Sequence, residues 1–275
     1  NICALGFPNS SYSWSVIGSA EDIRNAKIED FQRFYNKFYR PNNATLVIAG
    51  DINVFQAKEF VEEYYGSLPR GEKIKREYNP VKPLKEAKKV KIIDEKAQLP
   101  GVFLGYRAPS LKDSSYYAMS LLLDILASGE SSRLYQRLVD KEQIAAQASL
   151  VPLHLKKSGT VVFYGIANPD EDIDDVEEII RDEIKKLVEK GINEAELQKA
   201  KNIREAQFVS SKKDVLNKAQ DLAEFNALWG DPGMINSEIE KYMDLTVKDL
   251  NDVARKYLGT ENNYAIVFLP KGYDD

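Results

Sequence analysis

Two periods of apolar side chains alternate along the chain, and each predicts one kind of element. Apolar residues three or four positions apart in 20–39 and 55–65 predict amphipathic helices. Between them, residues 44–50 read Ala-Thr-Leu-Val-Ile-Ala-Gly, an apolar run of strand length. In the first helix Phe31, Phe34, Tyr35 and Phe38 share one face, which we interpret as core packing.

The same periods continue beyond residue 88. Strands are predicted at 89–93, 101–106, 144–154, 160–166 and 264–269. Helices are predicted at 116–126, 133–141, 174–189 and 247–258, with one or two more within 194–228. Between the two regions, Pro69, Gly71, Pro80 and Pro83 stand among charged residues and indicate a linker. We therefore predict an α+β chain with a first domain over 1–70, a linker over 71–88 and a second domain over 89–275.

An internal repeat indicates that the two domains are related. Residues 28–39 align with 247–258, so that Phe31 meets Leu250 and Phe34 meets Val253. With one inserted residue, 43–48 then align with 263–268. Both copies predict a helix, a turn and an apolar strand. Because the first copy ends near residue 50, the first domain is expected to be incomplete here. The first residue is Asn and no signal peptide is visible, so we expect a processed chain or a piece of a longer one.

Composition excludes several classes of protein. The 275 residues are 43% hydrophobic and 29% charged with a net charge of −5, which is typical of a globular protein and does not favour nucleic-acid binding. No apolar run is long enough to span a membrane. Cys3 and His154 are the only residues of their types, which excludes an intrachain disulfide and a Cys/His zinc finger. His154 lies in an alternating apolar segment and is interpreted as a partly buried strand residue.

Three segments carry a resemblance to a known family: 12–23, 34–51 and 127–143, which includes Ala-Ser-Gly-Glu-Ser-Ser-Arg-Leu-Tyr at 127–135. Together they resemble the pitrilysin-type zinc peptidases, which include insulin-degrading enzyme and the mitochondrial processing peptidase, and most of all the bacterial half-size subunits. The resemblance implies two related domains, each an antiparallel sheet with helices packed on it. It also implies hydrolysis of peptides in a chamber enclosed by two subunits or halves.

The same resemblance implies that this chain lacks the catalytic groups. The family's zinc motif, H-x-x-E-H with a later Glu, needs two histidines, and this chain has one. The family's Arg and Tyr, which stabilise charge at the scissile carbonyl, align with Val139 and Ala146, and neither can donate a side-chain hydrogen bond. We therefore expect no catalytic, cofactor-binding or metal-ligating residue here. Zinc would be bound by the parent protein, and this chain alone would be inactive.

Other interpretations stay open at this point. The chain could be a non-catalytic partner or scaffold subunit of such a peptidase, or an unrelated α+β ligand-binding protein. The resemblance implies a peptide substrate and a second peptidase-type subunit or a second copy as partners. Nucleic acid and a membrane span are not expected. The compartment is left open between bacterial periplasm and cytoplasm for a soluble protein.

Three short motifs have structural explanations. Residues 129–134 could be an anion-binding loop, but a helix start capped by Ser131 or Ser132, with Arg133 reaching a carboxylate, explains them better. The acidic residues 168–175 do not fit a calcium loop and are explained by the dipole of the following helix. Asn9 and Asn43 match the glycosylation sequon, which occurs often by chance.

Overall fold

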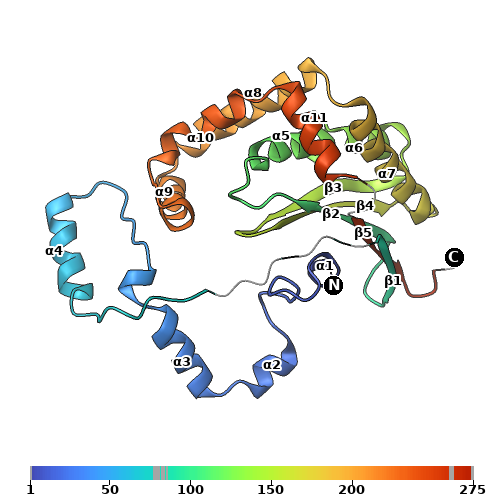
Figure 1. Ribbon diagram of the computed structural model, residues 1–275. Helices are drawn as coiled ribbons and strands as arrows, with labels where there is room; N and C mark the ends of the chain where they lie inside the picture. The colour runs from blue at the N-terminus through green and yellow to red at the C-terminus, as the bar shows by residue number, and fades with distance from the viewer. Residues whose placement is uncertain (1, 77–80, 82–83, 85, 260–262, 274–275) are drawn as a thin grey trace. The chain divides into compact units, whose positions relative to one another are not determined.

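The computed structural model describes residues 2–76, 81, 84, 86–259 and 263–273. These residues fall into two compact units. The first unit comprises residues 1–14, 79–203 and 241–275, and the second comprises residues 15–78 and 204–240. Each unit is considered by itself below, and Figure 1 shows the elements of both.

A five-stranded sheet forms the centre of the first unit. Its strands are β1 (Lys88–Asp94), β2 (Gly101–Ala108), β3 (Ala145–His154), β4 (Gly159–Ala167) and β5 (Asn263–Pro270). The order across the sheet is β1-β5-β2-β4-β3. All neighbours pair antiparallel except β1 and β5, which are parallel. The prediction of an antiparallel sheet is therefore wrong at this edge. β5 enters between β1 and β2, two strands that run in opposite directions, and so it must run parallel to one of them.

Helices α5 (Tyr116–Ala127), α7 (Ile173–Lys190) and α11 (Val247–Tyr257) cover one face of the sheet, and the short helix α1 (Ile2–Gly6) lies on the other (Figure 1). The apolar stripe of α7 supplies Val176, Ile180 and Leu187 to the core, all wholly buried. Gly165 of β4 faces α7, where any side chain would overlap Val176. The helices, whose apolar residues recur every 3.6 positions, and the strands, whose apolar residues recur every two, thus bury their apolar faces in one core, as the sequence predicts.

The remaining described elements between residues 133 and 243 are helical. They are α6 (Arg133–Tyr135), the π-helical turn η2 (Gln136–Lys141), α8 (Glu194–Ser211), α9 (Val215–Trp229) and α10 (Met234–Met243). The sequence predicts one short helix where α6 and η2 lie, and it predicts no helix at α10. The Gly230–Gly233 segment ends α9 with Gly230 in the left-handed conformation, so that a separate helix begins at Met234.

In the second unit, the N-terminal part contains α2 (Ala20–Asn25), α3 (Ile28–Phe38), the 3₁₀ turn η1 (Pro41–Asn43) and α4 (Val54–Tyr65). The single helix predicted over 20–39 is therefore interrupted, because Ala26 and Lys27 take extended backbone angles. The strand predicted over 44–50 is absent, since no described residue pairs with it. A strand requires a neighbour to satisfy its backbone groups, and an apolar run alone cannot provide one.

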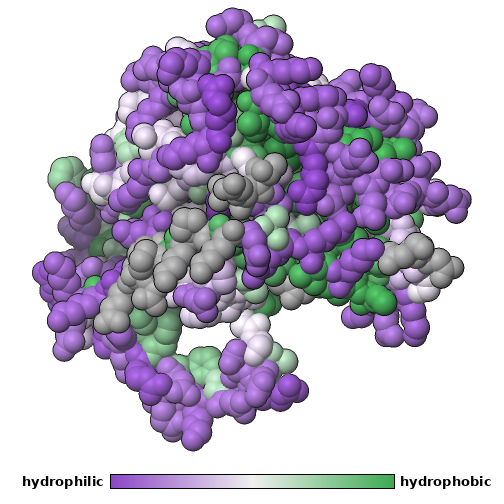
Figure 2. Space-filling model, turned by 45° about the vertical axis from the view of Figure 1, so that its right-hand side comes forward, coloured by the Kyte–Doolittle hydropathy of each residue, from purple (hydrophilic) through white to green (hydrophobic). Residues whose placement is uncertain are grey.

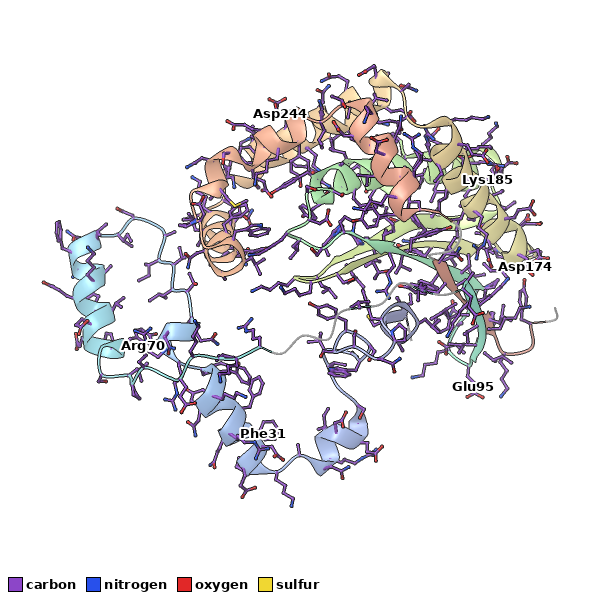
Figure 3. The ribbon with its side chains drawn as sticks, viewed as in Figure 1. Phe31, Arg70, Glu95, Asp174, Lys185 and Asp244 are labelled. Carbon is purple, nitrogen blue, oxygen red and sulfur yellow. The ribbon has the colours of Figure 1, made fainter. Side chains whose placement is uncertain are left out.

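The aromatic stripe of α3 is exposed, so its interpretation as packed core is wrong for the described residues. Phe31 is 62% exposed, Phe34 56% and Tyr35 59%. Phe31 lies on α3 in Figure 3. Figure 2 shows hydrophobic residues reaching the surface between hydrophilic ones on the face that it draws. The stripe has the helical period of a buried face, but the described residues of the second unit form no sheet that covers it.

The predicted linker over 71–88 falls partly on 77–80, 82, 83 and 85, which lie outside the described residues. Residues 71–76 form neither helix nor strand. Among the described helices, none combines the length and the apolar character that crossing a bilayer requires.

Candidate functional site

The positions that align with the family's Arg and Tyr lie on either side of the start of β3. Val139 is half-buried within η2, and Ala146 is exposed. Ala146 lies at a bulge, where the pairing of β3 with β4 shifts register between Ala145 and Gln147. Both side chains are hydrocarbon, so neither position can donate a hydrogen bond to a substrate carbonyl.

Polar and aromatic side chains that the sequence did not single out lie beside this bulge. The Gln147 amide donates to the Tyr164 hydroxyl at 3.1 Å. The Tyr164 ring stacks on Phe103 with 5.7 Å between ring centres, and Phe103 meets Phe268 edge-on at 5.5 Å. The alternation of each strand alone could have placed these rings on one face, but their adjacency depends on strand order.

The Gly129–Leu134 segment leads into a helix start, as predicted, but the expected side-chain cap is wrong for Ser132 at the position before the helix. Ser132 occupies the position before α6, and its hydroxyl donates to the Gly129 carbonyl at 2.7 Å instead of capping the helix. Arg133 pairs with Glu196 through two hydrogen bonds of 2.7 and 2.8 Å, which confirms the predicted carboxylate partner. Burial raises the pKa of Glu196, but the hydrogen bonds from Arg133 and the Asn193 backbone outweigh it, and the net pKa is lowered.

The acidic segment 168–175 likewise serves a helix. Asp174 and Asp175 lie in the first turn of α7, which agrees with the helix-dipole interpretation. In addition, the Asp172 side chain accepts from the backbone nitrogen of Asp174 at 2.9 Å and so caps the helix. Within the described ranges, no three His, Cys, Asp or Glu side chains converge as a metal site requires.

The residues present do not fit the zinc motif. The His154 ring lies at the end of β3, where Nδ1 is 3.1 Å from the Pro109 carbonyl. The ring also meets Tyr116 edge-on at 4.8 Å between ring centres. This histidine is partly buried in a strand, as the alternating pattern predicts. The motif needs a second histidine on the next turn of one helix.

An open cleft of about 770 Å³ lies between η2 and α7 and is lined by charged residues of both signs. Arg137 pairs there with Asp182 and with Glu183, the latter at 2.6 Å. Hydrogen bonds from Lys186 and Arg137 lower the pKa of Asp182 to about 2. Five cations (Arg133, Arg137, Lys141, Lys186 and Lys190) and three carboxylates (Asp140, Glu142 and Glu183) line the cleft, so its lining carries an excess of positive charge although Arg137 and Lys186 pair with Glu183.

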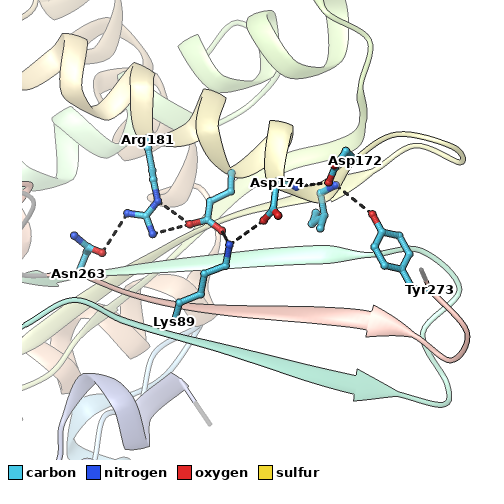
Figure 4. Close-up of polar contacts among 8 residues, drawn as sticks. Lys89, Asp172, Asp174, Arg181, Asn263 and Tyr273 are labelled. Carbon is cyan, nitrogen blue, oxygen red and sulfur yellow. Dashed lines mark hydrogen bonds and ion pairs between the residues drawn. The ribbon is translucent and has the colours of Figure 1, made fainter. Parts of the chain in front are cut away.

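A second ionic network ties β1 to α7 (Figure 4). Lys89 contacts Asp174 at 2.8 Å and Glu177 at 2.9 Å, and Arg181 pairs with Glu177 at 2.7 Å. Burial lowers the pKa of Lys89, but the two carboxylates outweigh it and raise the pKa above its ordinary value. Because β1 is an edge strand, this network fastens the sheet to its helix layer. Its role is structural.

The two sequons lie at exposed positions. Asn9 has a positive φ of 60°, and the Asn43 amide donates to the Phe38 carbonyl at 2.8 Å. The turn before residues 44–50 accounts for Asn43, as the sequence predicts.

Known proteins share both the sequence and the fold. The family model described as the peptidase M16 inactive domain matches residues 25–204. The zinc protease PqqE of Helicobacter pylori is 28% identical over 267 residues, which cover 94% of this chain and 59% of that protein. The crystal structure of a protease from Helicobacter pylori has a TM-score of 0.88 at 27% identity and covers 94% of this chain and 63% of that one. A peptidase M16 inactive domain from Pseudomonas fluorescens shares the fold, with a TM-score of 0.85 at 16% identity, over 99% of this chain and 64% of that one.

The chain spans about three fifths of the length of the curated relatives that it matches, at 59% and 58% of the first two. The match to the family model covers well over half of the chain, and the named relatives are proteases of the kind that the sequence resembles. The chain therefore belongs to the peptidase M16 inactive domain family.

Proposed function

We propose that this chain is the part of a zinc-dependent metalloendopeptidase subunit that binds no zinc and builds the wall of a chamber in which peptides are hydrolysed. The observation that carries the proposal is the pair of hydrocarbon side chains at Val139 and Ala146. A subunit without donors at these positions can enclose a peptide but cannot stabilise the charge that develops on its carbonyl. The chain alone would hydrolyse nothing.

The exposed face of α3 supports a second, related domain. The equivalent residues on α11 are Leu250, Val253 and Ala254, which are buried against the sheet and its helices. On α3 the aligned Phe31, Phe34 and Tyr35 are more than half exposed. Two copies of one unit should bury the same face. We therefore propose that residues 1–70 end a first domain, 71–88 form a linker and 89–275 form the second domain.

A shallow apolar groove supports the same organisation. It has a volume of about 370 Å³ and lies between residues 46–52 and α4, with Leu46, Ile48 and Phe60 among its lining residues. In the repeat, the segment aligned with 43–48 belongs to β5, which lies between two strands. We propose that the first domain of the whole protein covers this groove and that the zinc is bound in that domain.

The alternative is a non-catalytic partner or scaffold subunit of the same peptidase. The favoured partner in both cases is a second peptidase-type subunit or a second copy of the chain. The compartment, periplasm or cytoplasm of a bacterium, stays a prediction.

Sequencing the gene in frame upstream of residue 1 tests the proposal. H-x-x-E-H with a later Glu would support a zinc peptidase subunit. A related domain with those histidines replaced would overturn the catalytic parent in favour of the non-catalytic partner. An upstream sequence that does not complete a first domain related to the second would overturn both. In parallel, this chain should bind no stoichiometric zinc in a colourimetric assay, and tight binding would contradict the proposed division of roles.

A further inference from the structure

A short N-terminal segment covers part of the sheet face that carries no α5, α7 or α11. Residues 2–14, called the strap below, comprise α1 and the loop that follows it. Phe7 of the strap is wholly buried, and the centre of its ring lies 4.7 Å from the Arg107 guanidinium of β2. The Tyr12 ring meets Phe7 edge-on at 5.6 Å. A buried aromatic ring beneath a cation is a specific contact and not the loose covering of a surface.

The sheet is shaped to receive this segment. Tyr264 of β5 is wholly buried and crosses Gly105 of β2, where any side chain would overlap its ring. A side chain at Gly6 of the strap would likewise overlap the Tyr264 hydroxyl. Tyr264 therefore packs closely against two glycines, one from the sheet and one from the strap. Both glycines are needed because a Cβ at either position would push the ring out of place.

The strap also has a local structure that presents Phe7. The Ser10 hydroxyl donates to the Phe7 carbonyl and accepts from the Tyr12 backbone nitrogen, both at 3.1 Å. The Phe7 backbone nitrogen donates to the Cys3 carbonyl at 2.8 Å. These bonds close a compact turn around Phe7, so less conformational entropy is lost when it binds.

The course of the chain makes this contact unusual. Residues 1–14 pack within the first unit, whereas 15–78 belong to the second. The segment 15–78 is thus preceded by a strap that packs on the sheet and followed by residues that lead into β1. Residues 15–18, between the strap and α2, are all exposed.

We infer that the open face of the sheet carries a docking surface for residues 2–14 of the same chain, with Phe7 as the anchor. The strap is held by its own contacts and not by its covalent link to residue 15. It covers the surface formed by Arg107, Gly105 and Tyr264.

The test uses the whole chain with a protease site placed in the exposed residues 15–18. After cleavage under native conditions, the strap should co-elute with the remainder in gel filtration. Phe7→Ala should weaken its retention by about 100-fold, since truncating a buried Phe removes its contacts and leaves a cavity. Trp14→Ala is the matched control, because Trp14 lies in the same segment and is 66% exposed. Retention of that variant should equal the unsubstituted strap.

Circular dichroism and hydrogen exchange of β2 and β5 before cleavage show whether each variant is folded. If Phe7→Ala unfolds the sheet, Phe7→Leu replaces it, and we expect retention to fall about tenfold because the cation–ring contact is lost. The inference is overturned if the unsubstituted strap dissociates on cleavage. It is also overturned if the folded Phe7 variant is retained as tightly as the control. Either result would leave the proposed function untouched.

Discussion

The buried hydroxyl pair Tyr264–Thr160 allows the sharpest test of the packing described above. The two oxygens are 2.7 Å apart, and the Thr160 hydroxyl also donates to the Tyr106 carbonyl at 2.7 Å. Thr160 has a single hydroxyl proton, so Tyr264 must be the donor in their shared bond. Both residues are wholly buried, and no water can replace a lost partner without entering the core.

We predict that Tyr264→Phe and Thr160→Val each destabilise the sheet unit by about 1–3 kcal/mol, because the first removes the buried donor to Thr160 and the second leaves the Tyr264 hydroxyl without its acceptor. The double variant should lower the free energy of unfolding by about as much as one single variant, since both hydroxyls are then absent and neither lacks a partner. The coupling energy in the double-mutant cycle should therefore be about 1–2 kcal/mol.

The assay is native-state hydrogen exchange of peptides from β2 and β5, because a chain of two units does not unfold in a single step. Each 1.4 kcal/mol lowers protection about tenfold. Tyr64→Phe, at a residue 67% exposed, is the control and should change nothing. Additive single effects, with a coupling below about 0.3 kcal/mol, would refute the shared hydrogen bond between Tyr264 and Thr160.

Three further predictions concern single positions. Gln143 has a positive φ of 58°, a backbone conformation that favours glycine. Gln143→Gly should therefore raise the free energy of unfolding, measured in urea, by about 0.5–1 kcal/mol. A loss of stability would contradict the claim that the positive φ destabilises the protein at this position. Arg133→Met should destabilise the protein by about 1–3 kcal/mol at pH 7, because it leaves the Glu196 carboxylate without its partner. Folding lowers the pKa of Glu196, so the pair stabilises the protein above the ordinary pKa of a glutamate, and this contribution is lost as the pH falls through the lowered pKa. An equal effect of the substitution at pH 2 and pH 7 would contradict this reasoning. Burial raises the pKa of Tyr106 and of Tyr264 to about 12. The contribution of each buried tyrosine to the free energy of unfolding should therefore be fully present below pH 10 and fall by about 1.4 kcal/mol per pH unit between pH 10 and 12. A urea midpoint that stays constant over that range would contradict this prediction.

Much of the second half could be predicted because each element there buries one face. The strand patterns at 101–106 and 160–166 match β2 and β4 to within two residues, and the charged amphipathic pattern at 174–189 matches α7 to within one. The order of the strands could not be predicted in the same way. β5 pairs with β1 and β2, which are more than 150 residues away in the chain, and no local period encodes that pairing.

In the candidate site, too, the sequence predicted what depends on neighbouring residues and missed what depends on strand order. Local signals indicated acidic residues that favour the dipole of α7 and a carboxylate partner for Arg133, but they could not name Glu196, which is 63 residues away. The bulge at Ala146 and the ring contacts of Tyr164 depend on register and on strand order, so no spacing in the sequence indicates them.

By itself, the sequence determined most of the helices and strands beyond residue 88, the family resemblance, the internal repeat and the lack of a second histidine. These properties follow from residue type and from periods of two and 3.6 residues, which act over a few neighbours. Only the tertiary structure decided that residues 44–50 have no strand partner among the described residues and that the α3 stripe is exposed. It alone placed Phe7 against Arg107 on the sheet. A strand and a buried face each need a second surface, and which surface meets which is a property of the folded chain.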